Sequence, residues 1–136
     1  MEGIEEITQG EEVLVRILRH DRVWKKGLNF FSKDKDFIQV GTWGYDAKKQ
    51  LKAHSHNTVV REISKTQEVL YVKQGKLRVK IFGKDDNFVA EEVAFAGDIL
   101  IMLEGGHSYE IMEDNTQVLE IKNGPYVGAE LDRRRF

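Results

Sequence analysis

Short runs of apolar residues, separated by polar turns, follow one another along most of this chain. Residues 76–82 show the pattern most clearly, because apolar and charged side chains alternate there with a period of two. Such alternation predicts a strand that is buried on one face only. The runs predicted as strands are 13–18, 37–43, 58–63, 68–72, 76–82, 88–95, 99–103, 108–112 and 117–122. Gly75 lies in a tight hairpin signal between two of them.

Helical signal is weak. The only candidate is residues 2–9, an acidic segment in which Ile4 and Ile7 would share one side. Many short strands at regular spacing instead predict an all-β fold, a sandwich or a barrel. A length of 136 residues fits one domain, so we expect residues 1–136 to form a single unit.

Composition narrows the classes of function. The chain has no cysteine, which excludes a disulfide framework and thiol chemistry. A net charge of −2 argues against a general nucleic-acid binder, which would carry a basic face. No apolar run approaches the roughly 20 residues of a membrane span, and the acidic N-terminus lacks the plan of a signal peptide. We therefore expect a soluble, cytoplasmic protein without nucleic-acid or membrane partners.

Three histidines and one glutamate form the candidate site. His54 and His56 are two apart, so on a strand both would face the same side. Glu68 begins the strand predicted over residues 68–72, and His107 follows a glycine turn. Neighbouring strands would bring the four together, and imidazoles with a carboxylate are a common ligand set for a catalytic divalent metal.

These residues resemble the motifs of the cupin family. Its first motif is a His-x-His pair, a later Glu, and a Gly seven residues after that Glu, which His54, His56, Glu68 and Gly75 match. Its second motif opens with Gly-Asp and ends at a His after a turn, as in the 97–107 segment. The resemblance implies a jelly-roll barrel, the double-stranded β-helix, over about residues 37–122. It also implies one divalent metal held by His54, His56, Glu68 and His107.

The chain departs from the family pattern in the spacing of its glutamate. Eleven residues separate His56 from Glu68, more than the family usually has, so Glu62 competes for the same ligand position. We favour Glu68, because its spacing to Gly75 agrees with the motif. The ligand set suits zinc, iron, manganese or nickel and does not choose among them.

The resulting functional hypothesis is a small metal-binding cupin that acts on or binds a small polar molecule, a sugar or a carboxylate. As an enzyme it would be a metal-dependent isomerase or oxygenase. One alternative is a metal-free sugar-nucleotide isomerase or epimerase, with acid–base groups among His54, His56, Tyr71 and Tyr109. The other is a non-catalytic module that binds a sugar or carboxylate. The Gly-Pro-Tyr segment at 124–126 and the hairpin from Tyr71 to Gly75 look like those of cupins in surface-polysaccharide and sugar-nucleotide pathways.

We also expect a two-fold homodimer, the commonest closed oligomer. The strand predicted over residues 13–18 is apolar and has little to cover it within so short a chain. This strand, or the basic tail of residues 133–136, would then lie against the partner.

Overall fold

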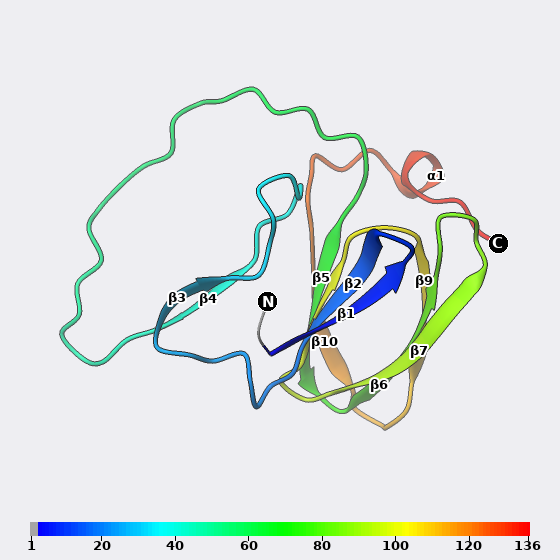
Figure 1. Ribbon diagram of the computed structural model, residues 1–136, viewed down its shortest axis with the longest axis horizontal. Coiled ribbons are helices and arrows are strands. Elements are labelled where there is room, and N and C mark those ends of the chain that lie inside the picture. The colour runs from blue at the N-terminus through cyan, green and yellow to red at the C-terminus, as the bar shows by residue number, and fades with distance from the viewer. Residues whose placement is uncertain (1–2) are drawn as a thin grey trace.

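The computed structural model describes residues 3–136, which form antiparallel sheets and one short helix (Figure 1). The five-stranded sheet has the order β1 (Ile4–Gln9), β2 (Glu12–Leu18), β8 (Ile99–Met102), β5 (Glu68–Gln74) and β10 (Gln117–Lys122). The three-stranded sheet has the order β7 (Phe88–Phe95), β6 (Lys76–Phe82) and β9 (Gly106–Ile111). A separate hairpin pairs β3 (Gly27–Phe30) with β4 (Gly41–Gly44), and α1 spans Ala129–Asp132. The expectation of an all-β fold is confirmed.

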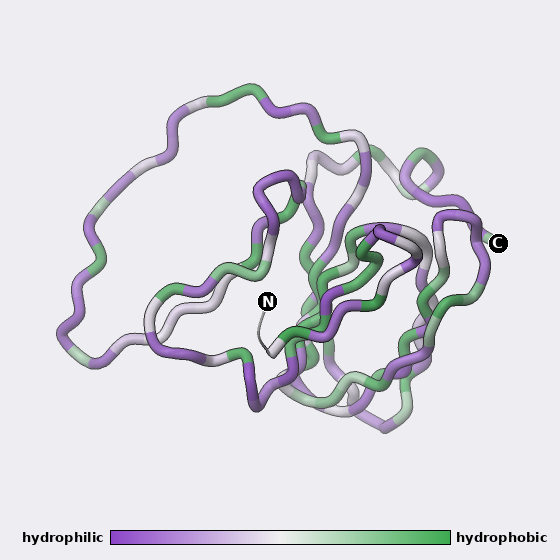
Figure 2. Tube along the Cα trace, in the orientation of Figure 1, coloured by the Kyte–Doolittle hydropathy of each residue, from purple (hydrophilic) through white to green (hydrophobic). Residues whose placement is uncertain are grey.

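The main core joins the two larger sheets. Leu14 of β2, Leu70 of β5 and Leu100 of β8 pack in one buried cluster with Leu77 and Ile81 of β6. Figure 2 shows the same distribution, with green apolar stretches gathered along the strands of both sheets. Alternation of side chains along each strand selects which residues enter this cluster. The two sheets are therefore layers around a shared interior.

A second cluster covers the opposite face of the five-stranded sheet. Val69 and Ile101 pack there against Val23 and Phe31 from the segment that follows β2. The fully buried Arg16 fastens this segment, because its NH1 group donates to Asp36 at 2.7 Å and to the carbonyl of Phe31 at 3.3 Å. This segment therefore shields from solvent the apolar side chains on that face of the five-stranded sheet.

The hairpin between β5 and β6 agrees with the sequence prediction. Gly75 forms the turn with φ of 87°, a conformation that glycine adopts far more readily than other residues. A Cβ atom at this position would also lie 2.6 Å from Cα of Thr116. Gly75 is therefore required both by its backbone angle and by the close approach of the neighbouring loop.

Two predictions of secondary structure were wrong. Residues 4–9 form strand β1 rather than a helix, and residues 1 and 2 lie outside the described residues. Residues three apart point to opposite faces of a strand, and accordingly Ile7 packs on the main core while Ile4 packs on the second cluster. The other error is the strand predicted over residues 58–63, where the structure has no strand.

Residues 45–67 instead form a long connection between β4 and β5, which Figure 1 shows bowing away from the sheets. All side chains from position 45 to 66 are exposed. The strand predicted over residues 37–43 is likewise reduced to β4 near its end. Within residues 3–136 no closed barrel forms, because β9 and β10 each pair on one side only.

Both of the dimer surfaces expected from sequence make contacts within the chain. Strand β2, which contains residues 13–18, lies between β1 and β8, and its central side chains are fully buried. In the tail, Arg134 forms a bidentate ion pair with Asp86, and the ring of Phe136 contacts that of Phe82. Strand β2 is therefore covered within the chain, which corrects that expected contact, while the ring of Phe136 stays 62% exposed. None of the helices in residues 3–136 has the length and apolar character needed to span a membrane.

Candidate functional site

Glu68 is the first residue of β5, so its side chain lies at one end of the interior between the two larger sheets. Its neighbours along the strand on the same face, Leu70 and Val72, belong to the main core. The strand pairs with β8 through Met102 and with β10 through Lys122 at this point. The carboxylate is therefore held among packed strands, and its side chain is only 7% exposed.

The opposite sheet supplies two partners for this carboxylate. His107 and Tyr109 lie on β9 opposite Ile81 and Val79, whose side chains are in the core. Both side chains therefore face the interior. Nε2 of His107 lies 3.0 Å from Oε1 of Glu68, and the hydroxyl of Tyr109 donates to the same oxygen at 2.9 Å. The two rings stack at a tilt, with centroids 4.9 Å apart.

These contacts set the charge states in the cluster. Burial alone would raise the pKa of Glu68, but the hydrogen bond and charge of His107, with the bond from Tyr109, lower that pKa to about 2. Burial and the nearby charge of Glu68 raise the pKa of Tyr109 above its ordinary value. Glu68 is thus ionised at neutral pH, and Tyr109 is a protonated donor rather than a base.

Two further residues from β10 complete the polar cluster. Nζ of Lys122 lies 3.9 Å from Oε2 of Glu68 and 3.7 Å from Oε1 of Glu120. The register pairs Lys122 directly with Glu68, while Glu120 is opposite Leu70. The pattern of the sequence indicated neither residue, because the pairing of β5 with β10 joins segments about fifty positions apart.

The site lies beside two edge strands, β9 and β10, and we call the free edges of these strands the seam. The side chain of His107 keeps 32% of its surface exposed, although it faces the interior. Nothing in residues 3–136 extends either sheet beyond these two strands. Solvent therefore reaches His107, while Glu68 stays shielded behind it.

His54 and His56 do not join this cluster in the structure. Both lie on the long exposed connection between β4 and β5, as does Glu62. Their imidazole rings are nevertheless close to each other, with centroids 5.2 Å apart in an edge-to-face arrangement. Of the two competing carboxylates, Glu68 is the one that contacts His107.

A divalent metal held by all four ligands does not fit this arrangement. Throughout residues 3–136, no three side chains of the His, Cys, Asp and Glu types are gathered closely enough to hold a metal ion. Glu68 and His107 are together, but two ligands leave a site incomplete when catalytic metals commonly use three from the protein. The groups that the cluster itself offers for chemistry are the acid and base side chains of Glu68, His107 and Tyr109.

The remaining motif residues have structural roles. Tyr71 packs against the second apolar cluster, on the opposite face of β5 from Glu68. Asp98 is fully buried and accepts backbone hydrogen bonds from Phe95 and His20, both at 2.9 Å, with Arg19 at 3.0 Å. The Gly-Asp pair thus fastens the turn before β8 and stays outside the site.

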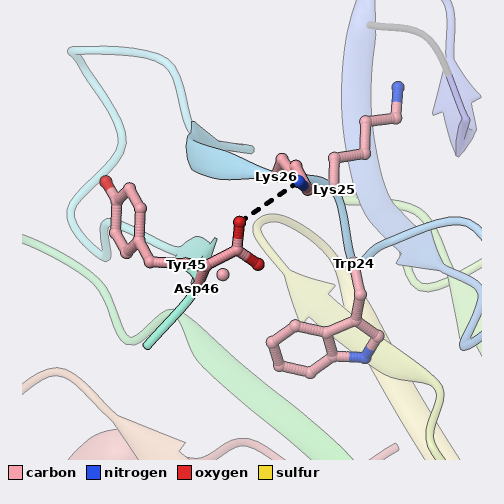
Figure 3. Close-up of a pocket in the computed structure, with 6 residues that line it drawn as sticks. Trp24, Lys25, Lys26, Tyr45 and Asp46 are labelled. Atoms are coloured by element: carbon pink, nitrogen blue, oxygen red, sulfur yellow. Dashed lines mark hydrogen bonds and ion pairs between the residues drawn. The ribbon is translucent and has the colours of Figure 1, made fainter. Parts of the chain in front are cut away.

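A separate hollow of about 220 Å³ lies beside the β3–β4 hairpin (Figure 3). Trp24 and Tyr45 flank it, and Lys26 pairs with Asp46 across it at 3.4 Å. None of the Glu68 cluster lines this hollow. It is open to solvent and has no buried polar group directed into it, so the Glu68 cluster is the stronger candidate.

The chain was also compared with other proteins. No protein-family model, no curated protein and no solved structure matches it.

Proposed function

We propose that the protein acts on a small polar molecule, a sugar or a carboxylate, by proton transfer at His107. The observation that supports this most directly is the contact of His107 and Tyr109 with one buried oxygen of Glu68. An ionised carboxylate behind an accessible imidazole is a recurring arrangement in general acid–base catalysis. The substrate would enter through the seam between β9 and β10.

The geometry also suggests the role of each group. Glu68 accepts the hydrogen on Nε2 of His107, which leaves Nδ1 with the lone pair in the neutral imidazole. Nδ1 would then take a proton from a carbon next to a substrate carbonyl and return it at a neighbouring position. Glu68 stabilises the imidazolium formed in between, and the Tyr109 hydroxyl holds the carboxylate in place. This sequence is an isomerisation; an epimerisation would need a second proton donor on the opposite face of the same carbon.

The motifs of the chain support the same substrate class. Their resemblance is to cupins, and within that family to members of sugar-nucleotide pathways. The shared core between two antiparallel sheets is compatible with a jelly roll whose barrel is incomplete in the single chain. We therefore propose a keto-sugar nucleotide as the first substrate class to test.

A metal-dependent cupin is the second candidate, because Glu68 and His107 are two of its four expected ligands and do meet. This metal-dependent reaction requires His54 and His56 to reach the seam beside His107. Elemental analysis of protein purified without a histidine tag separates the two candidates. One zinc, iron, manganese or nickel per chain, lost in the double variant His54→Ala, His56→Ala, would favour the metal-dependent reading.

The proton-transfer proposal is tested by exchange of substrate hydrogens with solvent. A panel of keto-sugar nucleotides is incubated with the protein in D₂O, and loss of the proton next to the ketone is followed by NMR. We expect His107→Gln to slow exchange at least a hundredfold, within the range that general acid–base groups contribute. Glu68→Gln should slow it as well.

Tyr71→Phe is the matched control, because Tyr71 lies on the other face of β5. Exchange that survives in His107→Gln would overturn the assignment. Chemical shift changes at the His107 ring without any exchange would identify a binding module in place of an enzyme. Absence of both exchange and binding across the panel would reject the substrate class.

A further inference from the structure

The connection between β4 and β5 contains a segment with no structural partner. We call residues 51–63 the arm. Within residues 3–136, no backbone hydrogen bond between main-chain groups involves residues 50–66. The arm nonetheless carries apolar side chains, and Val60 is 92% exposed. A structureless loop of this length in a compact domain is uncommon, and such loops are usually either functional or linker segments.

The two strands at the seam lack a neighbour on one side. Strand β9 pairs only with β6, and β10 pairs only with β5. Apolar side chains beside these edges remain exposed, among them Ile111 on β9 and Leu119 and Ile121 on β10. Open edges with uncovered apolar side chains are surfaces on which further strands are added.

The pattern of the arm matches the edge of β9. In an extended conformation His54, His56 and Val60 share one face, because they are separated by even numbers of residues. On β9, His107, Tyr109 and Ile111 form the row that faces the interior. An arm that runs parallel to β9 with its histidine face inward, and with His56 beside His107, would place Val60 beside Ile111 and bring both imidazoles to the His107 end of the strand.

We propose that two copies of the chain exchange their arms, each adding a strand to the free edge of β9 in the other. The arm bows away from its own sheets in Figure 1. Side-chain contacts hold the chain just after the arm, where Lys65 pairs with Glu104 and Thr66 with Asp132. A reciprocal exchange is a closed two-fold arrangement, which uses the same surfaces twice. It also replaces the dimer contact that β2 cannot provide, because β2 is paired on both sides.

Exchange would complete each site with residues from the partner. The partner's His54 and His56 would lie at the seam beside His107, and with Glu68 they form the ligand set of a divalent metal. This chemical role rests on the proposed site at Glu68 and His107. The exchange of arms does not depend on it, so each can be tested without the other.

Introduced cysteines test the exchange directly, because the chain has none of its own. Asn57 lies on the arm face opposite the histidines and, with His56 beside His107, is next to Ser108 on the outward face of β9. Asn57→Cys protein and affinity-tagged Ser108→Cys protein are mixed, co-incubated under mild oxidation and separated on a non-reducing gel. We expect a disulfide-linked heterodimer. Thr8→Cys, on β1 of the other sheet, replaces Ser108→Cys as the control and should give none.

A chain that carries both cysteines distinguishes two cases: an arm that pairs with the partner chain, and an arm that pairs with β9 of its own chain. A disulfide within one chain, with the mass of a monomer, would overturn the proposal, as would the absence of any cross-link between positions 57 and 108. The cross-link is read without metal or substrate. It can therefore fail while proton exchange at His107 succeeds, and the reverse also holds.

Two neighbouring valines provide a matched pair for the interface. Val60→Asp would place a charge on the buried face of the exchanged arm, so we expect the dimer dissociation constant, measured by light scattering over a dilution series, to rise at least tenfold. Val59→Asp changes the opposite face and should have a smaller effect. Neither change disturbs the single chain, since both side chains are exposed. A wild-type chain that stays monomeric at roughly 50 µM, far above a micromolar dissociation constant, would overturn the proposal, as would equal effects of the two variants.

Discussion

The hydroxyl of Tyr109 donates a 2.9 Å hydrogen bond to Oε1 of Glu68, from one sheet to the other. The bond joins β9 of the three-stranded sheet to β5 of the five-stranded sheet. Because the same oxygen also meets Nε2 of His107, the ionised carboxylate has hydrogen-bond partners although it is almost fully buried. A buried carboxylate without such partners would be costly in free energy. Changes to either partner should therefore be felt at Glu68.

Tyr109→Phe should raise the pKa of Glu68, because it removes one of the hydrogen bonds that favour the ionised form. The loss of the bond should also reduce the free energy of unfolding by about 1 kcal/mol. An NMR titration of the Glu68 side-chain carboxyl measures the pKa. His107→Gln should raise it further, since His107 has the larger stabilising influence, and Tyr71→Phe should leave it unchanged.

The stability of the protein should depend on Glu68 at acid pH. The pKa of this carboxyl falls from 4.5 to about 2 on folding, so its contribution is complete above pH 4.5 and is lost as the pH falls toward 2. Urea denaturation between pH 7 and pH 2 measures this loss, which is on the order of 3 kcal/mol. Glu68→Gln should flatten the curve in that window. Identical pH curves for the variant and the wild type would contradict the assignment.

Arg16→Ala should strongly destabilise the fold. The guanidinium is fully buried and pairs with Asp36 at 2.7 Å, whose side chain is itself only 7% exposed. Removal of one partner from a buried ion pair costs about 3–5 kcal/mol, because the other charge stays buried. Urea denaturation checks the value. The double variant Arg16→Met, Asp36→Asn should recover much of the loss.

Arg78→Ala is the control for this effect, because Arg78 pairs with Glu110 at the surface. Exposed ion pairs contribute about 0–1 kcal/mol. A loss in Arg78→Ala as large as that in Arg16→Ala would show that burial of the Arg16 pair is not the cause.

Gly75→Ala should destabilise the hairpin more than Gly10→Ala. Both glycines have positive φ, 87° and 62°, so each substitution carries a backbone penalty of about 1 kcal/mol. Only at Gly75 would the added Cβ also meet Thr116, whereas nothing lies within 4 Å at Gly10. Thermal denaturation of the two variants compares them. Equal shifts in Tm would indicate that the contact with Thr116 relaxes freely.

The local sequence pattern was sufficient to predict strands that bury one face and expose the other. Residues 76–82 alternate strictly, and the structure has β6 there with Leu77, Val79 and Ile81 in the core. The hairpin at Gly75 was also predictable from local sequence, because few residue types fit a tight turn. Local pattern failed at residues 58–63, where strand-type residues have no neighbouring strand within the single chain.

The candidate site was predictable in part. The motif pointed to Glu68 and His107, and the structure places them in contact. It did not distinguish Tyr109 from Tyr71, because the choice depends on which face of each strand turns toward the interior. It also missed Lys122, which reaches Glu68 only through the register of β10 on β5.

The sequence by itself determined the all-β class, the positions of most strands and the residue types available for chemistry, since these follow from periodicity and composition. The tertiary structure decided which of those residues meet. Contacts between Glu68, His107 and Tyr109 join strands that are distant along the chain, and their distances depend on the packing of one sheet on the other. That packing is a property of the whole core, so no local window of sequence contains it.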